Sequence, residues 1–237
     1  MFAALPYYDW NNMSRFEADY LRDSYKTKTD EYFTSAQRDY VARLPIDDSA
    51  RVLEIGCGNG ATGALALASG KCGTYVGVEM FEPMAQIAAK TITRVHIGNV
   101  ENMVLDYPVA HFDALICSEV LEHLVDPYST LVRLVKLIRP GGLVLASSPN
   151  ISHYLIIANL LRGKFEYSEA GAMDRTHLRW FTPPGYRQMF ENANVETLHL
   201  QRLAADKVGM ARKLLDMVPK PIGYLFWRQS DFIGQVR

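Results

Sequence analysis

Two carboxylates and an imidazole lie close together in the stretch CSEVLEHLVDP, residues 117–127. Glu119, Glu122 and His123 are separated by three positions and by one, so a helix would place all three side chains on one face. Together they can hold a divalent metal ion or move a proton. They also suit an ordinary helix start, in which Ser118 is the N-cap and the glutamates favour the positive end of the helix dipole. Spacing alone leaves both interpretations open.

A later histidine, His177, occurs in the run DRTHLRWFTPPG, residues 174–185. Thr182 followed by two prolines predicts that a helix starts just after this run. A lone histidine in such a polar, charged segment is unremarkable. Its interest depends on whether the fold brings it close to Glu122 and His123.

The elements that must position these residues follow a repeating order. Short apolar runs alternate with helical patterns, which predicts a parallel sheet covered by helices on both faces. We expect strands at 51–56, 74–79, 94–99, 112–118, 143–149, 195–203 and 230–237. We expect helices at 61–70, 82–92, 126–138 and 205–218, one or two more within 10–44, and a turn at 139–142. Ligands of such sheets bind beyond the carboxyl ends of the strands.

A glycine-rich loop, EIGCGNGATG, follows the first expected strand. Gly56, Gly58 and Gly60 let the backbone turn sharply and approach a ligand. With Ala61 the loop also matches the G-x-G-x-x-A dinucleotide pattern, so an NAD-type oxidoreductase is an alternative. Glu79 ends the second strand, where an acidic residue accepts hydrogen bonds from the two ribose hydroxyls of a nucleotide cofactor. This feature does not distinguish a dinucleotide from S-adenosylmethionine. Glu54 separates the two, because a carboxylate there suits the cationic S-adenosylmethionine better than a pyrophosphate.

With VLEIGCGNGATG, YVGVEM, IGNVEN, FDALICSEVLEHLVDP and LIRPGGLVLASSPN in order, the chain resembles the class I S-adenosylmethionine-dependent methyltransferases. The resemblance implies a Rossmann-like sheet of seven strands with an antiparallel last strand, and methyl transfer, which we expect to be O-methylation of a hydroxyl. It implies that Glu54 and the glycine loop hold the methionine part. By the same resemblance Glu79 takes the ribose. The other implied cofactor contacts are Met80, Asn99 and Val100 at the adenine and Ser118 near the methionine amino group.

The E-x-x-E-H run and the later D-x-x-H run also resemble two groups of O-methyltransferases, those of ubiquinone biosynthesis and the metal-dependent small-RNA 2′-O-methyltransferases. The resemblance implies a divalent ion, such as Mg²⁺ or Mn²⁺, held by Glu119, Glu122, His123 and His177. Without a metal, His177 or His123 would be the general base, with Glu119 in support. The same DRTHLR run resembles methyltransferases associated with cell-surface sugar synthesis, for which no metal is implied.

Composition and net charge limit the classes of molecule that the protein is expected to bind. A net charge of −1 and the absence of a recognisable RNA-binding module weigh against nucleic acid and favour a small-molecule, glycan or lipid-linked acceptor. Three cysteines without a C-x-x-C pair favour a reducing, cytoplasmic location. The apolar stretch 154–161 is too short to span a bilayer, but it and 221–227 can touch a membrane or pack as a lid. Arg162, Lys164, Arg175 and Arg179 either grip an anionic group or form a solvated face.

We expect one methyltransferase domain over 1–237, made of an N-terminal helical cap (1–46), a cofactor-binding core (47–150) and a lid insertion with the substrate part (151–237). The non-enzymatic alternative is a regulatory subunit that binds S-adenosylmethionine without turnover.

Overall fold

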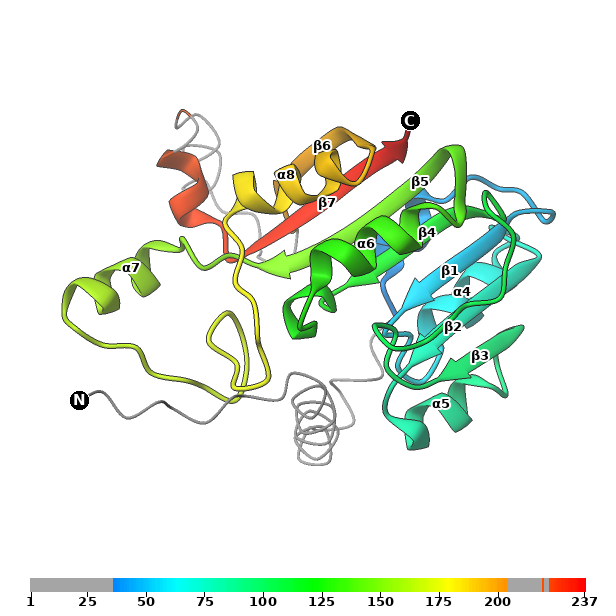
Figure 1. Cartoon of the computed structure of the whole chain (residues 1–237), viewed down its shortest axis with the longest axis horizontal. Helices are drawn as coiled ribbons and strands as arrows, with labels where there is room; N and C mark the ends of the chain where they lie inside the picture. The colour runs from blue at the N-terminus through cyan, green and yellow to red at the C-terminus, as the bar shows by residue number, and fades with distance from the viewer. Residues whose placement is uncertain (1–35, 204–218, 220–221) are drawn as a thin grey trace, which may run out of the picture.

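The computed structural model describes residues 36–203, 219 and 222–237 (Figure 1). Its strands are β1 (Arg51–Ile55), β2 (Thr74–Glu79), β3 (Arg94–Ile97), β4 (Phe112–Ser118), β5 (Ile138–Pro149), β6 (Val195–Arg202) and β7 (Gln229–Val236). Its α-helices are α3 (Arg38–Arg43), α4 (Ala61–Ala68), α5 (Glu82–Ala88), α6 (Pro127–Val135), α7 (Tyr154–Leu161) and α8 (Pro183–Asn192). Two 3₁₀ turns, η1 (Leu121–His123) and η2 (Ile222–Phe226), complete the described elements.

The seven strands form one sheet in the order β3-β2-β1-β4-β5-β7-β6. Strands β1 to β5 are parallel to one another, whereas β7 is antiparallel to both β5 and β6. The order reverses at β1 and β4, whose carboxyl ends therefore flank a crevice where a ligand can bind. The predicted seven-stranded Rossmann-like sheet with an antiparallel last strand is confirmed.

Two hydrophobic cores cover the two faces of the sheet. Alternate residues of β1 point to opposite faces, so Leu53 and Ile55 join one core and Val52 joins the other. The first core includes side chains of α6 and α8, which lie on the viewer's side in Figure 1. The second includes side chains of α3, α4 and α5. The central strands β1 and β4 are therefore buried on both faces, and a ligand can approach them at their ends.

Two helix starts follow the sequence prediction. The Asp126 carboxylate accepts a hydrogen bond from the Ser129 backbone N–H at 3.1 Å, with Pro127 in the first turn of α6. The Thr182 hydroxyl likewise accepts from the Gly185 N–H at 3.2 Å at the start of α8. In both cases the side chain satisfies a backbone donor that has no partner within the helix.

Two local predictions are wrong. The turn expected at 139–142 lies inside β5, which begins at Ile138 and pairs with Phe112 before the register shifts at a bulge. The stretch after β4 is not a helix capped by Ser118. Ser118 is the last residue of β4, and Glu119 has a left-handed backbone (φ 51°) before the short turn η1. The chain therefore reverses direction at Glu119, and the helical spacing of Glu119 and Glu122 does not apply.

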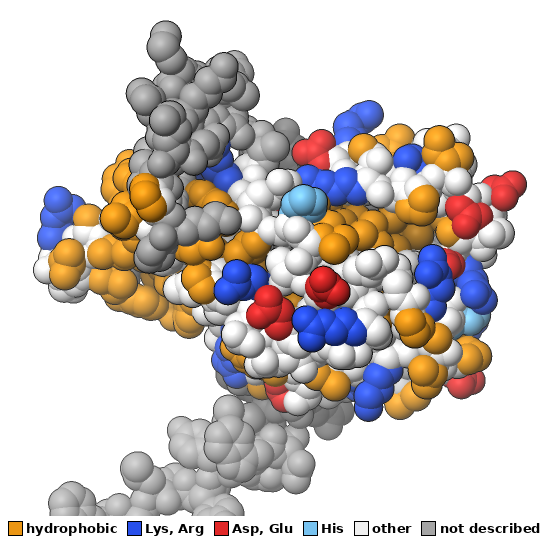
Figure 2. All heavy atoms as spheres, turned by 90° about the horizontal axis from the view of Figure 1, so that it is seen from above, with side chains coloured by type: hydrophobic (Ala, Val, Ile, Leu, Met, Phe, Trp, Pro, Cys, Tyr) orange, Lys and Arg blue, Asp and Glu red, His pale blue; other side chains and the backbone are white. Residues whose placement is uncertain are grey.

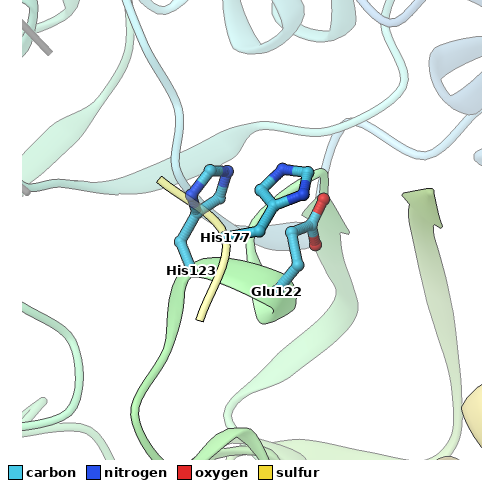
Figure 3. Close-up of side chains that lie close together, drawn as sticks. All are labelled: Glu122, His123 and His177. Carbon is cyan, nitrogen blue, oxygen red and sulfur yellow. The ribbon is translucent and has the colours of Figure 1, made fainter. Parts of the chain in front are cut away.

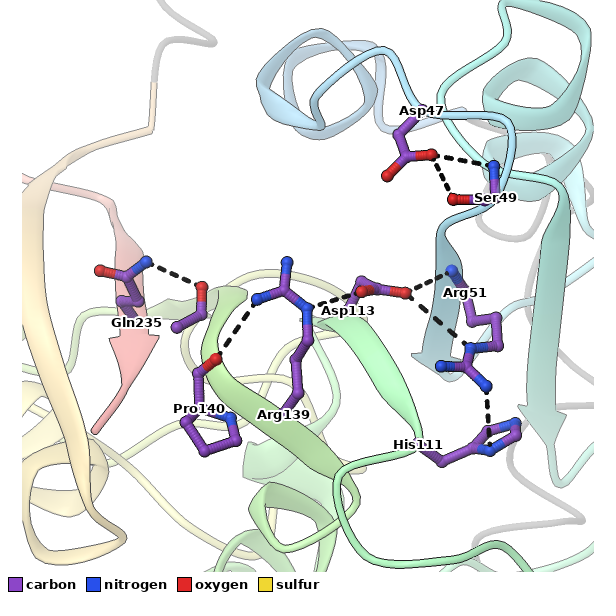
Figure 4. Close-up of polar contacts among 9 residues, drawn as sticks. Asp47, Ser49, Arg51, His111, Asp113, Arg139, Pro140 and Gln235 are labelled. Carbon is purple, nitrogen blue, oxygen red and sulfur yellow. Dashed lines mark hydrogen bonds and ion pairs between the residues drawn. The ribbon is translucent and has the colours of Figure 1, made fainter.

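At the opposite end of the sheet, Asp113 joins β1, β4 and β5 (Figure 4). Its carboxylate accepts from the Arg51 backbone N–H at 2.8 Å and from Arg139 Nε at 2.6 Å.

We expect Asp113→Ala to lower the unfolding free energy by about 1–2 kcal/mol, because a charge-assisted hydrogen bond is lost from a partly buried group. Urea denaturation checks this. The control Asp106→Ala, at an exposed carboxylate, should change it by about 0.5 kcal/mol or less, and equal effects would contradict the role of Asp113.

Several predictions fall outside the described residues. The helix at 205–218 and most of the expected N-terminal helices belong to this group, and only α3 is described from the latter. The division of the domain into cap, core and substrate part stays a prediction. None of the helices in the described ranges has the length and hydrophobicity that a bilayer-spanning helix needs.

Candidate active site

A cavity of about 400 Å³ opens at the carboxyl ends of the parallel strands. It is lined by nearly all of the residues predicted to bind the cofactor or to act in catalysis. These are Glu54, Gly56, Gly58, Glu79, Met80, Asn99, Val100, Ser118, Glu119, His123 and His177. Gly60 and Glu122 do not line it. Gly60 is the N-cap of α4 in a left-handed conformation (φ 82°), and Glu122 lies behind the cavity wall, buried to 1% exposure.

The glycine loop follows β1 along the cavity. Gly56 has a positive φ of 73°, and a side chain there would overlap Val120, so only glycine suits this position. The backbone N–H of Gly58 donates to Glu79 Oε2 at 2.9 Å, and Phe81 N–H donates to Glu79 Oε1 at 2.8 Å. Glu79 is therefore fixed at the end of β2 while each oxygen keeps a second lone pair for a ligand hydroxyl.

The Glu54 carboxylate lies between the cavity and the core. It accepts a hydrogen bond from the Tyr75 hydroxyl at 2.9 Å. Burial raises its pKa to about 8, although the Tyr75 hydrogen bond opposes this shift. A cation in the cavity would favour the ionised form and lower this pKa. Glu54 thus suits a positively charged ligand group.

This raised pKa predicts a pH dependence of stability in the cofactor-free protein. The folded state retains a proton on Glu54 that the unfolded state releases near its ordinary pKa of 4.5. The resulting contribution to the unfolding free energy is complete below that pH and is lost as the pH rises towards about 8. We expect the stability of the wild type to fall relative to Glu54→Gln by a few kcal/mol between about pH 5 and about pH 8. Urea denaturation across this range measures it, and parallel curves for the two proteins would contradict it.

The predicted adenine end of the cavity lies beside β3. Asn99 Oδ1 accepts from the Glu101 backbone N–H at 2.9 Å, so one of its lone pairs is used within the loop. The Glu101 carboxylate accepts from the backbone N–H groups of Val125 and Asp126 at 3.1 and 2.8 Å. Glu101 thereby ties this end of the cavity to the segment between η1 and α6.

The turn η1 and the segment 174–179 pack directly on one another. The Glu122 carbonyl accepts hydrogen bonds from the backbone N–H groups of Leu178 and Arg179 at 2.8 and 2.9 Å. Asp174 Oδ1 accepts from the N–H and the hydroxyl of Thr176 at 3.0 and 2.8 Å, which shapes the turn before His177. The aspartate of the D-x-x-H run therefore builds the loop that carries the histidine.

Glu122, His123 and His177 form a buried cluster (Figure 3). One ligand atom from each lies within 4.8 Å of the others, and the two imidazole rings have centroids 4.8 Å apart. His123 Nδ1 lies 3.1 Å from the Thr176 carbonyl, and His177 Nδ1 lies 3.3 Å from the Ala172 carbonyl. Since a carbonyl only accepts, each Nδ1 carries a proton, and in the neutral imidazole the lone pair is then on Nε2. This tautomer suits a metal ligand or a base.

The carboxylate of Glu122 is the unusual member of the cluster. It is almost fully buried, and within the described part of the chain neither of its oxygens has a hydrogen-bond partner of good geometry; the nearby Ser148 hydroxyl opposes only part of the rise in the Glu122 pKa. Burial raises its pKa well above the ordinary value, and the nearby Glu119 carboxylate raises it further. An unpartnered buried carboxylate is costly, so this residue fits a site that a cation or a proton completes.

Glu119 lies outside this cluster. Its Oε2 accepts a hydrogen bond from Gln229 Nε2 at 3.0 Å, and burial raises its pKa to about 6. Gln229 and Asp174 also line the cavity, although neither was predicted as a site residue and Asp174 was noted only as part of the D-x-x-H run. Gln229 begins β7, and the start of an antiparallel strand lies at the same edge as the ends of the parallel ones. The predicted strand direction could therefore have identified this position.

The cavity wall is acidic. Its charged residues within the described ranges are all carboxylates, namely Glu54, Glu79, Glu101, Glu119 and Asp174. The four cations proposed to grip an anion do not line it, and Arg175 instead pairs with Glu169 at 2.9 Å. A pyrophosphate would meet repulsion here, whereas a sulfonium and an amino group would be attracted. Fold and cavity together define a class I S-adenosylmethionine-dependent methyltransferase.

The chain belongs to a family of methyltransferase domains, whose sequence profile matches residues 29–200. Membership of this family implies S-adenosylmethionine as the methyl donor and favours it over the nicotinamide cofactor of an oxidoreductase. Trans-aconitate 2-methyltransferase of Azoarcus sp. is 32% identical over 116 residues, which cover 49% of this chain and 46% of that protein. Ubiquinone biosynthesis O-methyltransferase of Thiobacillus denitrificans is 31% identical over 170 residues, 63% of this chain and 66% of that protein.

The fold is also that of solved methyltransferases. A S-adenosylmethionine-dependent methyltransferase from Archaeoglobus fulgidus superposes with a TM-score of 0.58 over 86% of this chain and 96% of that chain, at 19% identity. The chain spans about half the length of the first relative above and about two thirds of the second. The similarity therefore covers only part of these relatives and does not identify the methyl acceptor of this chain.

Proposed function

We propose that the enzyme methylates a hydroxyl oxygen of a small-molecule, sugar or lipid-linked acceptor. The hydroxyl oxygen attacks the methyl carbon of S-adenosylmethionine, the carbon–sulfur bond breaks, and its electron pair stays on the sulfur of S-adenosylhomocysteine. The hydroxyl proton must leave in this step. An alcohol is a weak nucleophile at neutral pH, so a group that takes or displaces this proton is needed.

The observation that carries the proposal is the buried Glu122 carboxylate without a hydrogen-bond partner of good geometry, beside two histidines with oriented rings. Two imidazoles and one carboxylate are a donor set typical of Mn²⁺, Fe²⁺ or Zn²⁺ more than of Mg²⁺. Glu122, His123 and His177 would hold the ion, with Glu119 alongside. When bound, such an ion lowers the pKa of a coordinated hydroxyl. The histidines are oriented by the carbonyls of Thr176 and Ala172, and without a metal either imidazole would accept the proton.

The acidic cavity wall also supports a hydroxyl acceptor that is neutral or positively charged. An acceptor with several carboxylates, as in the name of trans-aconitate 2-methyltransferase, would be repelled by the carboxylates of Glu119 and Asp174, which line the cavity together with His123 and His177. A hydroxyl acceptor, as in the name of the ubiquinone biosynthesis O-methyltransferases, has no such conflict. No lysine or arginine of the described residues lines this wall, which weighs further against the phosphate backbone of a nucleic acid.

Transfer of a radiolabelled methyl group from S-adenosylmethionine to fractionated cell extract tests the proposal. We expect label in a hydroxyl-bearing fraction, loss of transfer in EDTA, and recovery on addition of Mn²⁺. Full transfer in EDTA would contradict the requirement for a metal ion. His123 or His177 would then be the general base. Label on nitrogen or carbon alone would overturn O-methylation. Absence of transfer to any fraction would favour the non-catalytic regulatory subunit.

A further inference from the structure

The carbonyl oxygen of Ala172 contacts two side chains at once. His177 Nδ1 lies 3.3 Å from it, and the indole Nε1 of Trp180 donates a hydrogen bond to it at 3.0 Å. A carbonyl oxygen has two lone pairs and can accept both hydrogen bonds. Trp180 therefore holds the same oxygen atom that orients the His177 imidazole.

The loop that carries Ala172 is closed by hydrogen bonds between its own backbone groups. The N–H of Ser168 donates to the Met173 carbonyl at 2.8 Å, and the N–H of Arg175 donates to the Ser168 carbonyl at 3.1 Å. These two hydrogen bonds shape the loop, but neither of them fixes its tip relative to the turn η1. A contact from outside the loop is needed for that.

Trp180 supplies such a contact, because it belongs to a segment that is anchored on both sides. The backbone N–H groups of the two preceding residues donate to the Glu122 carbonyl at 2.8 and 2.9 Å. The following residue, Phe181, is buried, and its carbonyl accepts from the Ile151 N–H at 3.0 Å. The indole N–H thus ties the tip of the loop at Ala172 to a segment that is itself fixed to η1.

The ring of Trp180 is held in an aromatic cluster. Its centroid lies 5.9 Å from that of Phe165, in an edge-to-face arrangement, and 6.3 Å from that of Tyr167. Phe165 and Tyr167 are half exposed, so the outer side of the cluster reaches the surface, where hydrophobic side chains gather at the α7 end of the molecule (Figure 2). Ring contacts of this kind have preferred geometries, so they restrict the direction in which the indole N–H points.

We propose that Trp180 is a positioning residue for methyl transfer. Its indole N–H holds the Ala172 carbonyl, this carbonyl holds the His177 ring, and the segment that carries Trp180 also holds the backbone of Glu122. The placement of His177 relative to Glu122 is thus set through Trp180. The inference deepens the proposed function and rests on the role given there to His177. Trp180 does not line the cavity, so it acts through Ala172 rather than on the cofactor or the acceptor.

The tautomer of His177 in the cofactor-free protein tests the proposal without metal or acceptor. Nitrogen-15 NMR at a pH where the imidazole is neutral distinguishes the two tautomers, and His177→Gln assigns the signals by their loss. We expect the wild type to hold the Nδ1–H tautomer. Trp180→Phe keeps an aromatic ring in the cluster but removes the N–H donor, so the Ala172 carbonyl is no longer fixed. We expect the Nε2–H tautomer to appear in this variant.

Isothermal titration with Mn²⁺ gives a second readout. We expect Trp180→Phe to bind Mn²⁺ roughly tenfold to a hundredfold more weakly, the range for loss of a group that orients a metal ligand. With the acceptor fraction identified by labelling, kcat should fall by a similar factor. The KM for S-adenosylmethionine and the affinity for S-adenosylhomocysteine should stay at their wild-type values, which also shows that the variant is folded.

Tyr167→Phe is the matched control, because it changes a ring of the same cluster without removing the indole N–H. It should equal the wild type in all of these measurements. A wild-type tautomer in Trp180→Phe would overturn the proposal. An equal change in Tyr167→Phe would also overturn it, since the effect would then come from packing of the cluster. A wild type without affinity for Mn²⁺ would contradict the metal in the proposed function, whereas the tautomer would still report the role of Trp180.

Discussion

We expect Glu122→Gln to lower methyl transfer by roughly a hundredfold to ten-thousandfold, the range for the proton removal that the cluster of Glu122, His123 and His177 would assist, and at the same time to stabilise the cofactor-free protein. The two effects have one cause. The buried carboxylate has no hydrogen-bond partner of good geometry within the described chain, so its charge opposes folding until a cation or a proton completes the site. Glutamine keeps the shape and removes the charge. The gain in unfolding free energy near neutral pH should be about 1–3 kcal/mol.

Transfer is measured with the acceptor fraction identified by labelling, and stability by urea denaturation without cofactor. Isothermal titration with Mn²⁺ reports the loss of a ligand independently of turnover. Glu166→Gln, at an exposed carboxylate two residues after Lys164, is the matched control and should change none of these quantities. A Glu122→Gln protein that is less stable than the wild type, or that transfers methyl groups at the wild-type rate, would contradict the proposed site.

The second large effect concerns cofactor affinity. We expect Glu79→Gln to weaken the binding of S-adenosylhomocysteine by about a hundredfold, since hydrogen bonds to a charged acceptor are worth about 1.5–3 kcal/mol each. The amide group would also turn an N–H donor towards the backbone N–H of Gly58 or Phe81, both of which now donate to Glu79. The glycine loop would then lose an anchor.

Isothermal titration with S-adenosylhomocysteine measures this loss. Glu82→Gln is the matched control, because Glu82 is an exposed carboxylate three residues further on that bonds to Gln86 at 3.1 Å. We expect its affinity to equal that of the wild type. An affinity of Glu79→Gln within about threefold of the wild type would show that the carboxylate does not take the ribose.

The sequence predicted the core of the fold because local signals agree there. Apolar runs bounded by glycine and capped helices determine β1, β2, β4, α6 and α8 with little help from the rest of the chain. The left-handed Glu119 carries no such signal, because most residues with positive φ are glycine and this one is a glutamate. It is stabilised by its place in the fold, where its backbone N–H donates to the Ser147 carbonyl at 3.1 Å.

The candidate site was predictable only in part for the same reason. Glu122, His123 and His177 were named from two motifs more than fifty residues apart, and the structure brings them together. Glu119 was grouped with them from helical spacing, but the reversal after β4 turns it towards Gln229. That pairing joins residues 110 positions apart, so no local pattern announces it.

The placement of β7 between β5 and β6 has a consequence for how the site is assembled. In the described sheet β6 pairs with β7, which the ribosome synthesises after it. Residues 195–202 therefore have no strand to pair with until β7 has left the ribosome. The Gln229–Glu119 hydrogen bond can form only after that point. The half of the cavity around Glu54 and Glu79 needs none of this and can form on the nascent chain. We expect the Glu119–Gln229 contact to form last, after the contacts that position Glu122, His123 and His177.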